Sequence, residues 1–587
     1  MSTRVGSPGG RPPSPSRQTA ARRARLHRTS ALLAICGLAF VIGAVVGARH
    51  TPAGEAHAKR FAQAWARGDY AAMYSELTPG ERDRISRLRF TGAYQSAMRT
   101  ATATKVVTGK PRKDGDVYRV PVSIPTRAFG TVDGEVVLPT TGEGVDWSRA
   151  LVFPGLAAGE RLRRVTQMPP RATLLARDRT VLATGDDRAS SSPVATQVVG
   201  SLGPIPPERR AELARLGVPS DAEVGVSGLE RIFDDRLIGR PGGELLAGTR
   251  VLRRTQPQQA QAVRTTISLP VEQAAVTALG GRLGGVVAIQ PRTGEVLGFA
   301  GIGFSGLQPP GSTFKMITTT GALEAGITNP SKVYPVQQKA VLEGVDLENA
   351  NGEYCGGTLL VSFAKSCNSV FAPLGAQLGA KRLVDVAQRY GFNQPPDIVG
   401  AAESTIPAPG DIGDDLAVGS SAIGQGRVQA TALQMATVAA AIGLRGRRPH
   451  LSLDFDAADG HVASTERATS PQVARTMERL MLAVVRGGTG VRAAIPGVKV
   501  AGKTGTAELK STKRCQPDPA NPAACPPEQQ VNDPKDTDAW FAAYAPAGTG
   551  HPRIAVGVLL VSAGAGGDTA APVARDVLLE GLKRSKG

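Results

Sequence analysis

Three short stretches of the chain carry side chains that together could perform acyl transfer through a serine ester. Ser312 and Lys315 are three residues apart, a spacing that puts a hydroxyl and an amine on the same face of a helix. A serine hydroxyl is a weak nucleophile, and a neighbouring basic group can activate it. Hydroxyl, amide and ammonium groups are added by two further stretches, Ser366-Cys367-Asn368 and Lys503-Thr504-Gly505-Thr506.

Lys315 can act as a base only if it loses its proton, because the ordinary pKa of a lysine is about 10.4. Burial and a second ammonium group both lower that pKa, and Lys503 is the candidate for the second charge. We therefore expect Lys315 to be partly neutral and to take the proton of Ser312. Ser366 is expected to relay a proton to the departing amine, and Asn368 to offer its amide to the substrate backbone.

The third stretch is predicted to lie on a strand that begins at Val498. Lys503 and Gly505 would then share one face, and a glycine there lets a peptide lie alongside as an added strand. The ammonium of Lys503 and the hydroxyls of Thr504 and Thr506 suit a terminal carboxylate. The backbone N–H groups of Ser312 and Thr506 are expected to form the oxyanion hole.

Taken singly, each stretch also fits a capped helix, a polar turn or the end of a strand. In this order the set resembles the S-x-x-K, S-D-N and K-T-G signature of penicillin-binding proteins and class A β-lactamases, with Cys367 in place of the Asp. The segments Ile423-Gly424-Gln425-Gly426 and Trp540-Phe541 add to the resemblance. It implies a penicillin-sensitive serine D,D-transpeptidase. Its partners would be peptidoglycan stem peptides, β-lactam antibiotics and other cell-wall or division proteins.

Several alternatives share this site or this fold. A class A β-lactamase needs a glutamate to hydrolyse the ester, and the single Glu between Ser366 and Glu466 is Glu403, which makes that activity improbable. A D,D-carboxypeptidase remains open because water and an amine compete for the same ester. A scaffold of the cell-wall machinery without turnover is the non-enzyme alternative. A drug-sensing receptor would need a signalling domain that the 29-residue tail cannot hold.

The N-terminal region is predicted to anchor the protein. Residues 1–29 are rich in Pro, Ser and Arg, and residues 30–48 contain no charge. Nineteen residues at about 1.5 Å each reach roughly 28 Å, close to the thickness of a hydrocarbon core. Because the arginines precede this run, we expect a single-pass helix with the tail in the cytoplasm and the bulk of the chain outside. A cleaved signal peptide is the rival interpretation.

The formal charge of +19 raises the question of nucleic-acid binding. Part of the charge precedes the apolar run, where it sets topology, and the rest is thinly spread, so we expect no nucleic-acid partner. The histidines do not cluster, and neither a metal nor another cofactor is expected. Outside the anchor, four cysteines stand in a compartment that favours disulfides, and they permit three pairings. The loop between Cys515 and Cys525 favours that pair, which would leave Cys355 with Cys367, and metal binding is the weaker alternative.

The pattern of elements predicts a multidomain chain. Residues 52–165 begin with a helix at 55–77 and continue with strands at 117–124, 130–138 and 150–153, an α+β unit that resembles the NTF2-like domain of some class B penicillin-binding proteins. Residues 166–262 are expected to be a strand-rich linker or dimerisation domain. Residues 263–587 are expected to be an α/β transpeptidase domain of the β-lactamase-like fold, in which a helical insert splits a five-stranded antiparallel sheet. No glycosyltransferase domain fits before residue 262, which places the resemblance in class B.

Overall fold

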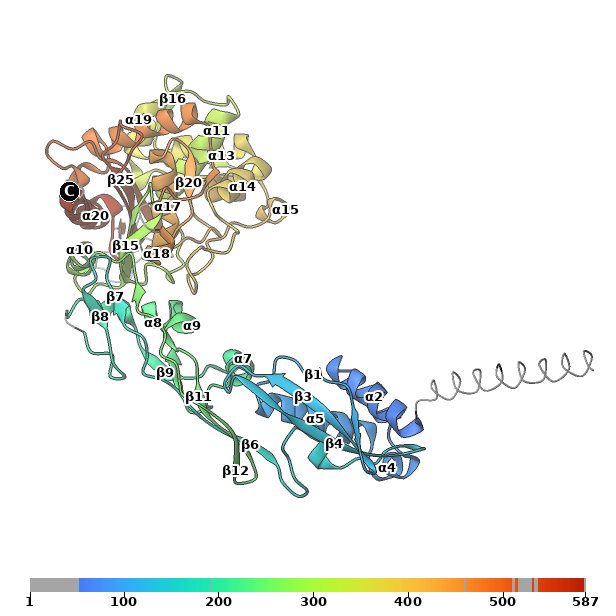
Figure 1. The fold of residues 1–587 in the computed structure, drawn as a ribbon. Helices are drawn as coiled ribbons and strands as arrows, with labels where there is room; N and C mark the ends of the chain where they lie inside the picture. Colours follow the sequence, from blue (N-terminus) through green and yellow to red (C-terminus); the bar gives the residue numbers. More distant parts are fainter. Residues whose placement is uncertain are drawn as a thin grey trace, which may run out of the picture. The chain divides into compact units, whose positions relative to one another are not determined.

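The computed structural model describes residues 38, 52–190, 192–458, 461–508, 513–515, 530–532 and 537–584. The predicted tail and, apart from Leu38, the predicted anchor lie outside the described residues. Within the described ranges, no helix is both long and apolar enough to cross a membrane. The chain divides into two compact units, drawn in Figure 1. The first unit comprises Met1–Gln167, Glu212–Val218 and Pro241–Gln256, and the second comprises Met168–Ala211, Pro219–Arg240 and Pro257–Gly587.

The first unit packs helices on an antiparallel sheet. Its helices are α2 (Ala53–Ala66), α3 (Tyr70–Ser75), α4 (Pro79–Arg84), α5 (Arg87–Thr100) and most of α7 (Arg210–Leu216). Its main sheet contains β1 (Val107–Thr108), β2 (Arg112–Asp114), β3 (Val117–Pro125), β4 (Thr131–Thr141) and β5 (Gly144–Val145). Alternate residues of β3 are buried, as expected for a strand with one face on a core. Phe61, Trp65 and Tyr94 lie in that core, and the ring centroid of Tyr94 is 6.5 Å from that of Phe61 and 5.5 Å from that of Trp65.

Two predicted elements of this unit were wrong. The expected helix at 55–77 is two helices, because Gly68 adopts a left-handed φ of +70° after α2. Asp69 then caps α3 by accepting a hydrogen bond from the Ala72 N–H at 2.9 Å. The expected strand at 150–153 is a 3₁₀ turn at Arg149–Val152.

The segment predicted as a linker, 166–262, is shared between the two units. Strand β11 (Gly242–Ala247) is the centre of a three-stranded antiparallel sheet in the first unit, flanked by β6 (Leu162–Gln167) and β12 (Arg250–Thr255). The chain thus returns to the first unit after crossing part of the second, since strand pairing joins residues far apart in sequence. The domain boundaries at 165 and 262 stay a prediction.

The amino-terminal part of the second unit is held by a buried ion network. Its elements are β7 (Leu174–Leu175), β8 (Val181–Ala183), α6 (Ala195–Val199), β9 (Leu202–Pro204), β10 (Glu223–Gly225), α8 (Gly228–Ile232), α9 (Asp234–Leu237) and β13 (Val263–Arg264). Arg171 contacts Glu230 and Asp234, each at 2.5 Å. Arg188 lies 2.5 Å from the second oxygen of Glu230, and Arg209 lies 2.5 Å from the second oxygen of Asp234. Both carboxylates are 1% exposed.

The rest of the second unit is a five-stranded antiparallel sheet with helices on both faces. The strand order is β15 (Glu295–Gly301), β14 (Gly284–Gln290), β26 (Ile554–Leu560), β25 (Thr537–Ala545), β22 (Ala501–Glu508). This confirms the predicted fold class. One face packs against α10 (Leu269–Leu279) and α20 (Gly566–Arg584), and the other packs against α17 (Ala432–Gly443).

The helical insert lies between β15 and β22, as predicted. Its helices are α11 (Lys315–Glu324), α12 (Leu359–Lys365), α13 (Asn368–Leu378), α14 (Ala380–Arg389), α15 (Pro409–Ile412), α16 (Asp415–Ala422), α17, α18 (Phe455–Ala458) and α19 (Pro471–Gly487). The insert also contains short strands: β16 (Val333–Gln337), β17 (Lys339–Leu342), β18 (Val345–Glu348), β19 (Cys355–Thr358), β20 (Arg447–Pro449) and β21 (Thr465–Arg467). The hairpin β23 (Lys513–Cys515) and β24 (Gln530–Asn532) follows β22.

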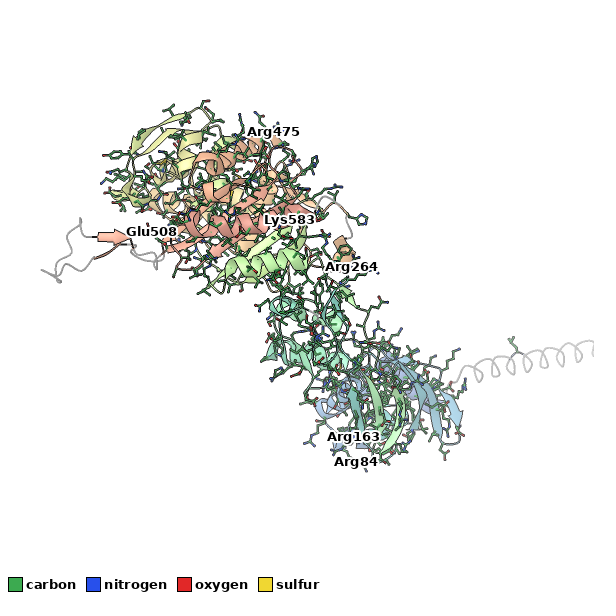
Figure 2. All side chains as sticks on the ribbon, turned by 90° about the vertical axis from the view of Figure 1, so that its left-hand side faces the viewer. Arg84, Arg163, Arg264, Arg475, Glu508 and Lys583 are labelled. Atoms are coloured by element: carbon green, nitrogen blue, oxygen red, sulfur yellow. A yellow bond between two sulfur atoms is a disulfide. The ribbon has the colours of Figure 1, made fainter. Side chains whose placement is uncertain are left out.

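Basic side chains project from both units. Figure 2 labels Arg84 and Arg163 on the first unit, and Arg475 and Lys583 on the second. All four residues are exposed. Both units therefore carry positive charge, which agrees with the thin spread of basic residues along the sequence.

A buried carboxyl in α10 makes the stability of the second unit depend on pH. Burial raises the pKa of Glu272 from its ordinary 4.5 to about 8, and the Phe299 N–H donates to its Oε2 at 2.8 Å. The stability that the protonated group contributes is complete below pH 4.5 and is lost as the pH rises through about 8. At pH 9 we expect the free energy of unfolding of Glu272→Gln to be higher than that of the wild type by more than about 1 kcal/mol. At pH 5 we expect no such increase.

Pulse proteolysis in urea at the two pH values, with fragments mapped by mass spectrometry, measures this difference for the second unit alone. The exposed Glu343→Gln is the matched control. An equal effect of Glu272→Gln at both pH values would contradict the prediction.

Candidate active site

The backbone just before Ser312 turns sharply and presents it at the start of a helix. Gly311 has a left-handed φ of +51°, and a Cβ there would lie 2.7 Å from the Thr506 carbonyl oxygen. Residues Gly311–Phe314 form a 3₁₀ turn that leads directly into α11. The α-helix α11 therefore begins at Lys315, three residues after Ser312. Ser312 is partly buried, whereas Lys315 is fully buried.

The amine of Lys315 lies among four oxygen atoms. Its Nζ is 2.9 Å from Ser312 Oγ, 2.8 Å from the Ser366 carbonyl oxygen and 2.7 Å from Asn368 Oδ1. Ser366 Oγ is the fourth, at 3.3 Å. The carbonyl and the amide oxygen can only accept hydrogen bonds, so they take the two hydrogens of a neutral amine. The remaining lone pair then faces the hydroxyl of Ser312, which is the geometry of a base.

The environment of Lys315 favours the neutral amine. Burial lowers its pKa well below the ordinary 10.5, and the charge of Lys503 lowers it further. Burial also lowers the pKa of Lys503, to about 7. Lys503 Nζ donates to Ser366 Oγ at 2.8 Å and to the Thr504 carbonyl oxygen at 3.1 Å. Ser366 Oγ thus joins the two amines, as expected of a proton relay.

The second stretch is held at a break between two helices. Ser366 ends α12 in a left-handed conformation with φ of +65°, and Asn368 begins α13. Asn368 Nδ2 donates to the Glu348 carbonyl oxygen at 2.8 Å, which fixes the amide so that its oxygen faces Lys315. The amide nitrogen expected to contact a substrate backbone is therefore bonded within the protein. Lys365 is the last residue of α12.

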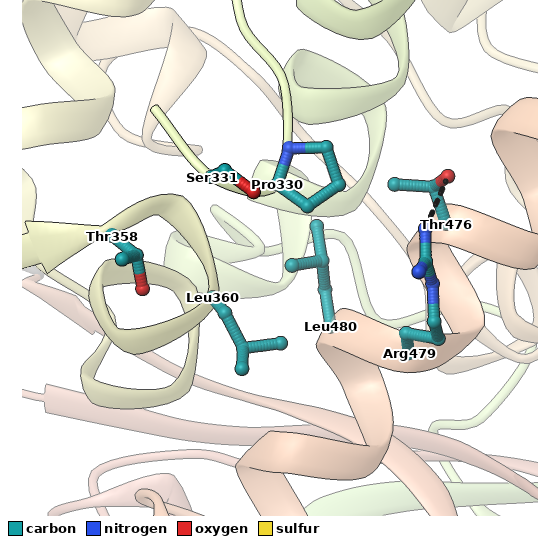
Figure 3. Close-up of a pocket in the computed structure, with 7 residues that line it drawn as sticks. All are labelled: Pro330, Ser331, Thr358, Leu360, Thr476, Arg479 and Leu480. Atoms are coloured by element: carbon teal, nitrogen blue, oxygen red, sulfur yellow. Dashed lines mark hydrogen bonds between the residues drawn. The ribbon is translucent and has the colours of Figure 1, made fainter. Parts of the chain in front are cut away.

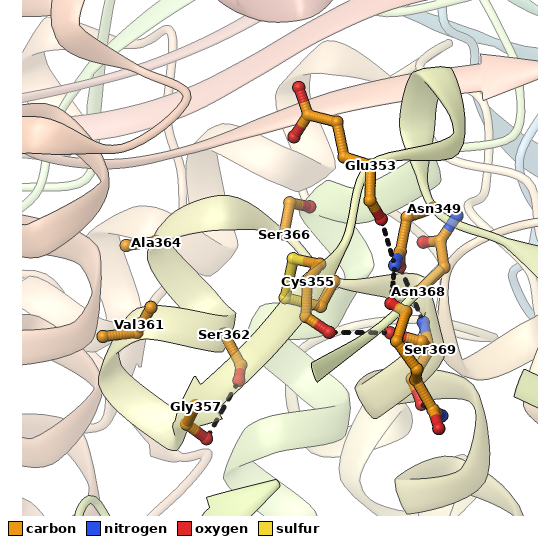
Figure 4. Close-up of a disulfide and its surroundings, with 12 residues drawn as sticks. Asn349, Glu353, Cys355, Gly357, Val361, Ser362, Ala364, Ser366, Asn368 and Ser369 are labelled. Atoms are coloured by element: carbon orange, nitrogen blue, oxygen red, sulfur yellow. Dashed lines mark hydrogen bonds between the residues drawn. A yellow bond between two sulfur atoms is a disulfide. The ribbon is translucent and has the colours of Figure 1, made fainter. Parts of the chain in front are cut away.

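A disulfide fastens this break to β19. Cys355 and Cys367 are bonded, and Cys367 is buried between the two site residues rather than a free thiol (Figure 4). Asn349 adds polar contacts: it donates to the carbonyl oxygens of Gln337 and Glu353 and accepts from the Ser369 N–H at 2.9 Å. Of the other expected pair, Cys515 ends β23 and Cys525 lies outside the described residues.

The third stretch lies on β22, at the edge of the sheet. Lys503 pairs with Ala542 and Gly505 pairs with Trp540, so the two residues share a face, as expected. A Cβ at Gly505 would lie 2.7 Å from the Pro310 carbonyl oxygen, so a larger residue would clash with the turn that carries Ser312. Glycine at this position lets strand β22 approach the nucleophile closely.

The structure thus brings the eight predicted residues to one place, where α11, the α12–α13 break and β22 meet. Helix α19, which packs against α12 and β22, was not predicted. Its sequence signal was nevertheless present: Ser470 caps the helix, Pro471 begins it and apolar residues recur at helical spacing. Thr489, just beyond α19, reaches Thr504 Oγ1 at 2.6 Å. Only the tertiary contact reveals that residue.

A separate pocket of about 340 Å³ lies between α12 and α19 (Figure 3). Its lining residues are Pro330, Ser331, Thr358, Leu360, Thr476, Arg479 and Leu480. None of the eight predicted site residues lines this pocket. Within the described part of the chain, no cluster of three or more His, Cys, Asp or Glu side chains could hold a metal ion.

Residues 284–579 match the model of the penicillin-binding protein transpeptidase domain, which covers more than half of the chain. The chain is a class B member of the penicillin-binding protein family. Residues 53–160 match the NTF2-like N-terminal transpeptidase domain, which confirms the predicted resemblance.

Curated relatives and solved structures of this family are similar to the chain. Peptidoglycan D,D-transpeptidase PbpA of Mycolicibacterium smegmatis is 34% identical over 409 residues, 60% of this chain and 77% of that relative. The PbpA of Mycobacterium tuberculosis is 32% identical with the same coverage. The penicillin G acyl-enzyme complex of penicillin-binding protein A from M. tuberculosis matches with a TM-score of 0.53 and 28% identity, covering 70% of this chain and 99% of that structure. The penicillin-binding protein is thus similar to actinobacterial penicillin-binding protein A.

Proposed function

We propose that this penicillin-binding protein is a peptidoglycan D,D-transpeptidase that uses Ser312 as its nucleophile. The observation that carries the proposal is that Lys315 Nζ lies 2.9 Å from Ser312 Oγ. The two N–H groups of a neutral Lys315 amine also have their acceptors, the Ser366 carbonyl oxygen and Asn368 Oδ1. The similar PbpA proteins are named for this activity, and a relative has been solved as a penicillin G acyl-enzyme.

The reaction has two acyl transfers. Ser312 Oγ attacks the carbonyl carbon of the penultimate D-Ala while its proton passes to Lys315. The C–N bond to the terminal D-Ala breaks as Ser366 passes its proton to the departing amine and takes the proton held by Lys315, which leaves Lys315 neutral again. An amine of a neighbouring stem peptide then attacks the ester, an amide bond forms as the ester C–O bond breaks, and the Ser312 oxygen takes up the proton that the amine loses. The backbone N–H groups of Ser312 and Thr506 stabilise the oxyanion in each step.

The carboxylate of the terminal D-Ala binds at β22. Lys503 supplies a cationic side chain, and Thr504 and Thr506 supply hydroxyl hydrogens. Residues 30–48 anchor the chain in the cell membrane as a single helix, with the catalytic domain outside. The chain also contacts other cell-wall or division proteins. These assignments rest on the sequence pattern and the family.

Intact-mass spectrometry after incubation with penicillin tests the nucleophile. We expect one covalent adduct on the wild type and none on Ser312→Ala. Release of D-Ala from a pentapeptide with and without an amine acceptor then separates transpeptidation from carboxypeptidation. A wild type without adduct, or an equal adduct on Ser312→Ala, would refute the proposal, and release that is unaffected by the acceptor would favour the carboxypeptidase.

The two lysines predict a bell-shaped pH profile for acylation. The rate rises with pH as Lys315 loses its proton, at a pKa well below 10.5. It falls again above about pH 7, as Lys503 loses the charge that holds the carboxylate. A guanidinium stays charged throughout this range, so Lys503→Arg should remove the alkaline limb. Stopped-flow acylation by a chromogenic β-lactam between pH 5 and 10 compares the wild type with Lys503→Arg, and an unchanged alkaline limb in Lys503→Arg would contradict the assignment.

A further inference from the structure

Thr489 links two of the three stretches that form the site. Its backbone N–H donates to the carbonyl oxygen of Ala364 at 3.1 Å, two residues before Ser366. Its hydroxyl oxygen lies 2.6 Å from Thr504 Oγ1 on β22 and 3.4 Å from the same Ala364 carbonyl. The residue therefore touches both the end of α12 and the strand that carries Lys503.

Either hydroxyl could donate in the 2.6 Å contact between Thr489 and Thr504, and the lengths of the two contacts of the Thr489 hydroxyl favour one direction. The Ala364 carbonyl already accepts the Thr489 N–H, and at 3.4 Å it is a poor acceptor for the hydroxyl of the same residue. The 2.6 Å separation from Thr504 is a strong O–H···O distance. The shorter contact favours donation of the Thr489 hydroxyl hydrogen to Thr504, and with that direction the hydrogen of Thr504 is left for another acceptor.

The second threonine of β22 is arranged in the same way. The Gly566 N–H at the start of α20 donates to Thr506 Oγ1 at 3.3 Å. A Cβ at Gly566 would lie 2.2 Å from the Gly505 carbonyl oxygen, so the first turn of α20 packs directly on β22. Each of the two hydroxyl oxygens thus accepts a hydrogen bond from the protein. Both hydroxyls are then free to donate to a common anionic acceptor.

We propose that Thr489 is a positioning residue that determines specificity for a carboxylate on the acyl donor, because it directs the hydrogen of Thr504 toward that carboxylate. This inference rests on the proposed function, in which β22 binds the terminal carboxylate. Thr489 itself is exposed, whereas Thr504 is 5% exposed. Removing the Thr489 hydroxyl therefore opens no cavity in the core, and the variant is expected to fold.

The test compares a penicillin with its methyl ester, which lacks the carboxylate charge, on four proteins. In Thr489→Val we expect the second-order rate of acylation by the free acid to fall about tenfold, and the rate for the ester to stay within about twofold of wild type. Thr489→Ser, which restores the hydroxyl, should recover most of the rate for the acid. The matched control is Thr569→Val, whose hydroxyl bonds only the Ala565 carbonyl of its own helix region at 3.2 Å.

The outcomes separate this inference from the proposed function. Equal losses for acid and ester in Thr489→Val would indicate a merely structural role and overturn the inference. An unchanged rate for the acid would overturn it as well. In both cases the wild type is still acylated at Ser312, so the proposed function stands. A wild type that is not acylated at all would refute the proposed function, and the inference would fall with it.

Discussion

Lys315→Ala is expected to lower the second-order rate of acylation by a β-lactam by at least about a thousandfold while leaving the fold intact. The base is lost, and the pKa of an unassisted serine hydroxyl is far too high for attack at neutral pH. Lys315 also donates to Asn368 Oδ1 at 2.7 Å and to the Ser366 carbonyl oxygen at 2.8 Å, so the substitution removes these two contacts as well. Stopped-flow measurements with a chromogenic β-lactam give the rate.

Lys332→Ala is the matched control for that measurement. Its amine also donates to a backbone carbonyl, that of Ile327 at 2.7 Å, but Lys332 contacts none of the eight site residues in the described part of the chain. We expect its acylation rate to stay within about twofold of wild type. If Lys315→Ala kept more than about a tenth of the wild-type rate, Lys315 would not be the base and the proton of Ser312 would need another acceptor.

Glu230→Ala is expected to destabilise the second unit by about 3–5 kcal/mol. Arg171 and Arg188 both contact this carboxylate at 2.5 Å, and their side chains are only 7% and 9% exposed. Removing the acid leaves two buried guanidinium groups with part of their charge uncompensated, which costs more than the ion pair itself contributes. Arg171 keeps Asp234 as a partner, so the loss falls most heavily on Arg188.

The neighbouring Asp235→Ala serves as the comparison. Asp235 contacts Arg209 at 2.6 Å, but its side chain is 74% exposed, and exposed ion pairs contribute about 0–1 kcal/mol. Pulse proteolysis in urea, with fragments mapped to each unit, reports both variants. Similar losses for the two substitutions would show that burial does not govern the strength of this network.

The chemistry of the site could be predicted because it depends on residue types and local spacing. Ser312 and Lys315 must share a helix face at that spacing, and Lys503 and Gly505 must share a strand face, whatever surrounds them. The five strands of the sheet were also predictable, because runs of apolar residues bounded by turns mark them. One strand start differs by three residues, because β22 begins at Ala501 instead of Val498.

The elements that failed were those decided by a single backbone conformation. Gly68 breaks the expected first helix with a left-handed φ, and Arg149–Val152 forms a turn where apolar residues suggested a strand. A short apolar run fits either structure, and packing against the rest of the unit selects one.

By itself, the sequence determined the set of reactive groups, the class of fold and the order in which the three stretches occur. Only the tertiary structure decided which atoms meet: that Ser366 Oγ lies between both amines, that Asn368 turns its amide oxygen to Lys315, and that Thr489 reaches Thr504. The physical reason is that hydroxyl, amide and ammonium groups act over hydrogen-bond distances of about 3 Å. Contacts that short, between residues 15 to 137 positions apart, are fixed by packing in three dimensions and leave no local pattern in the chain.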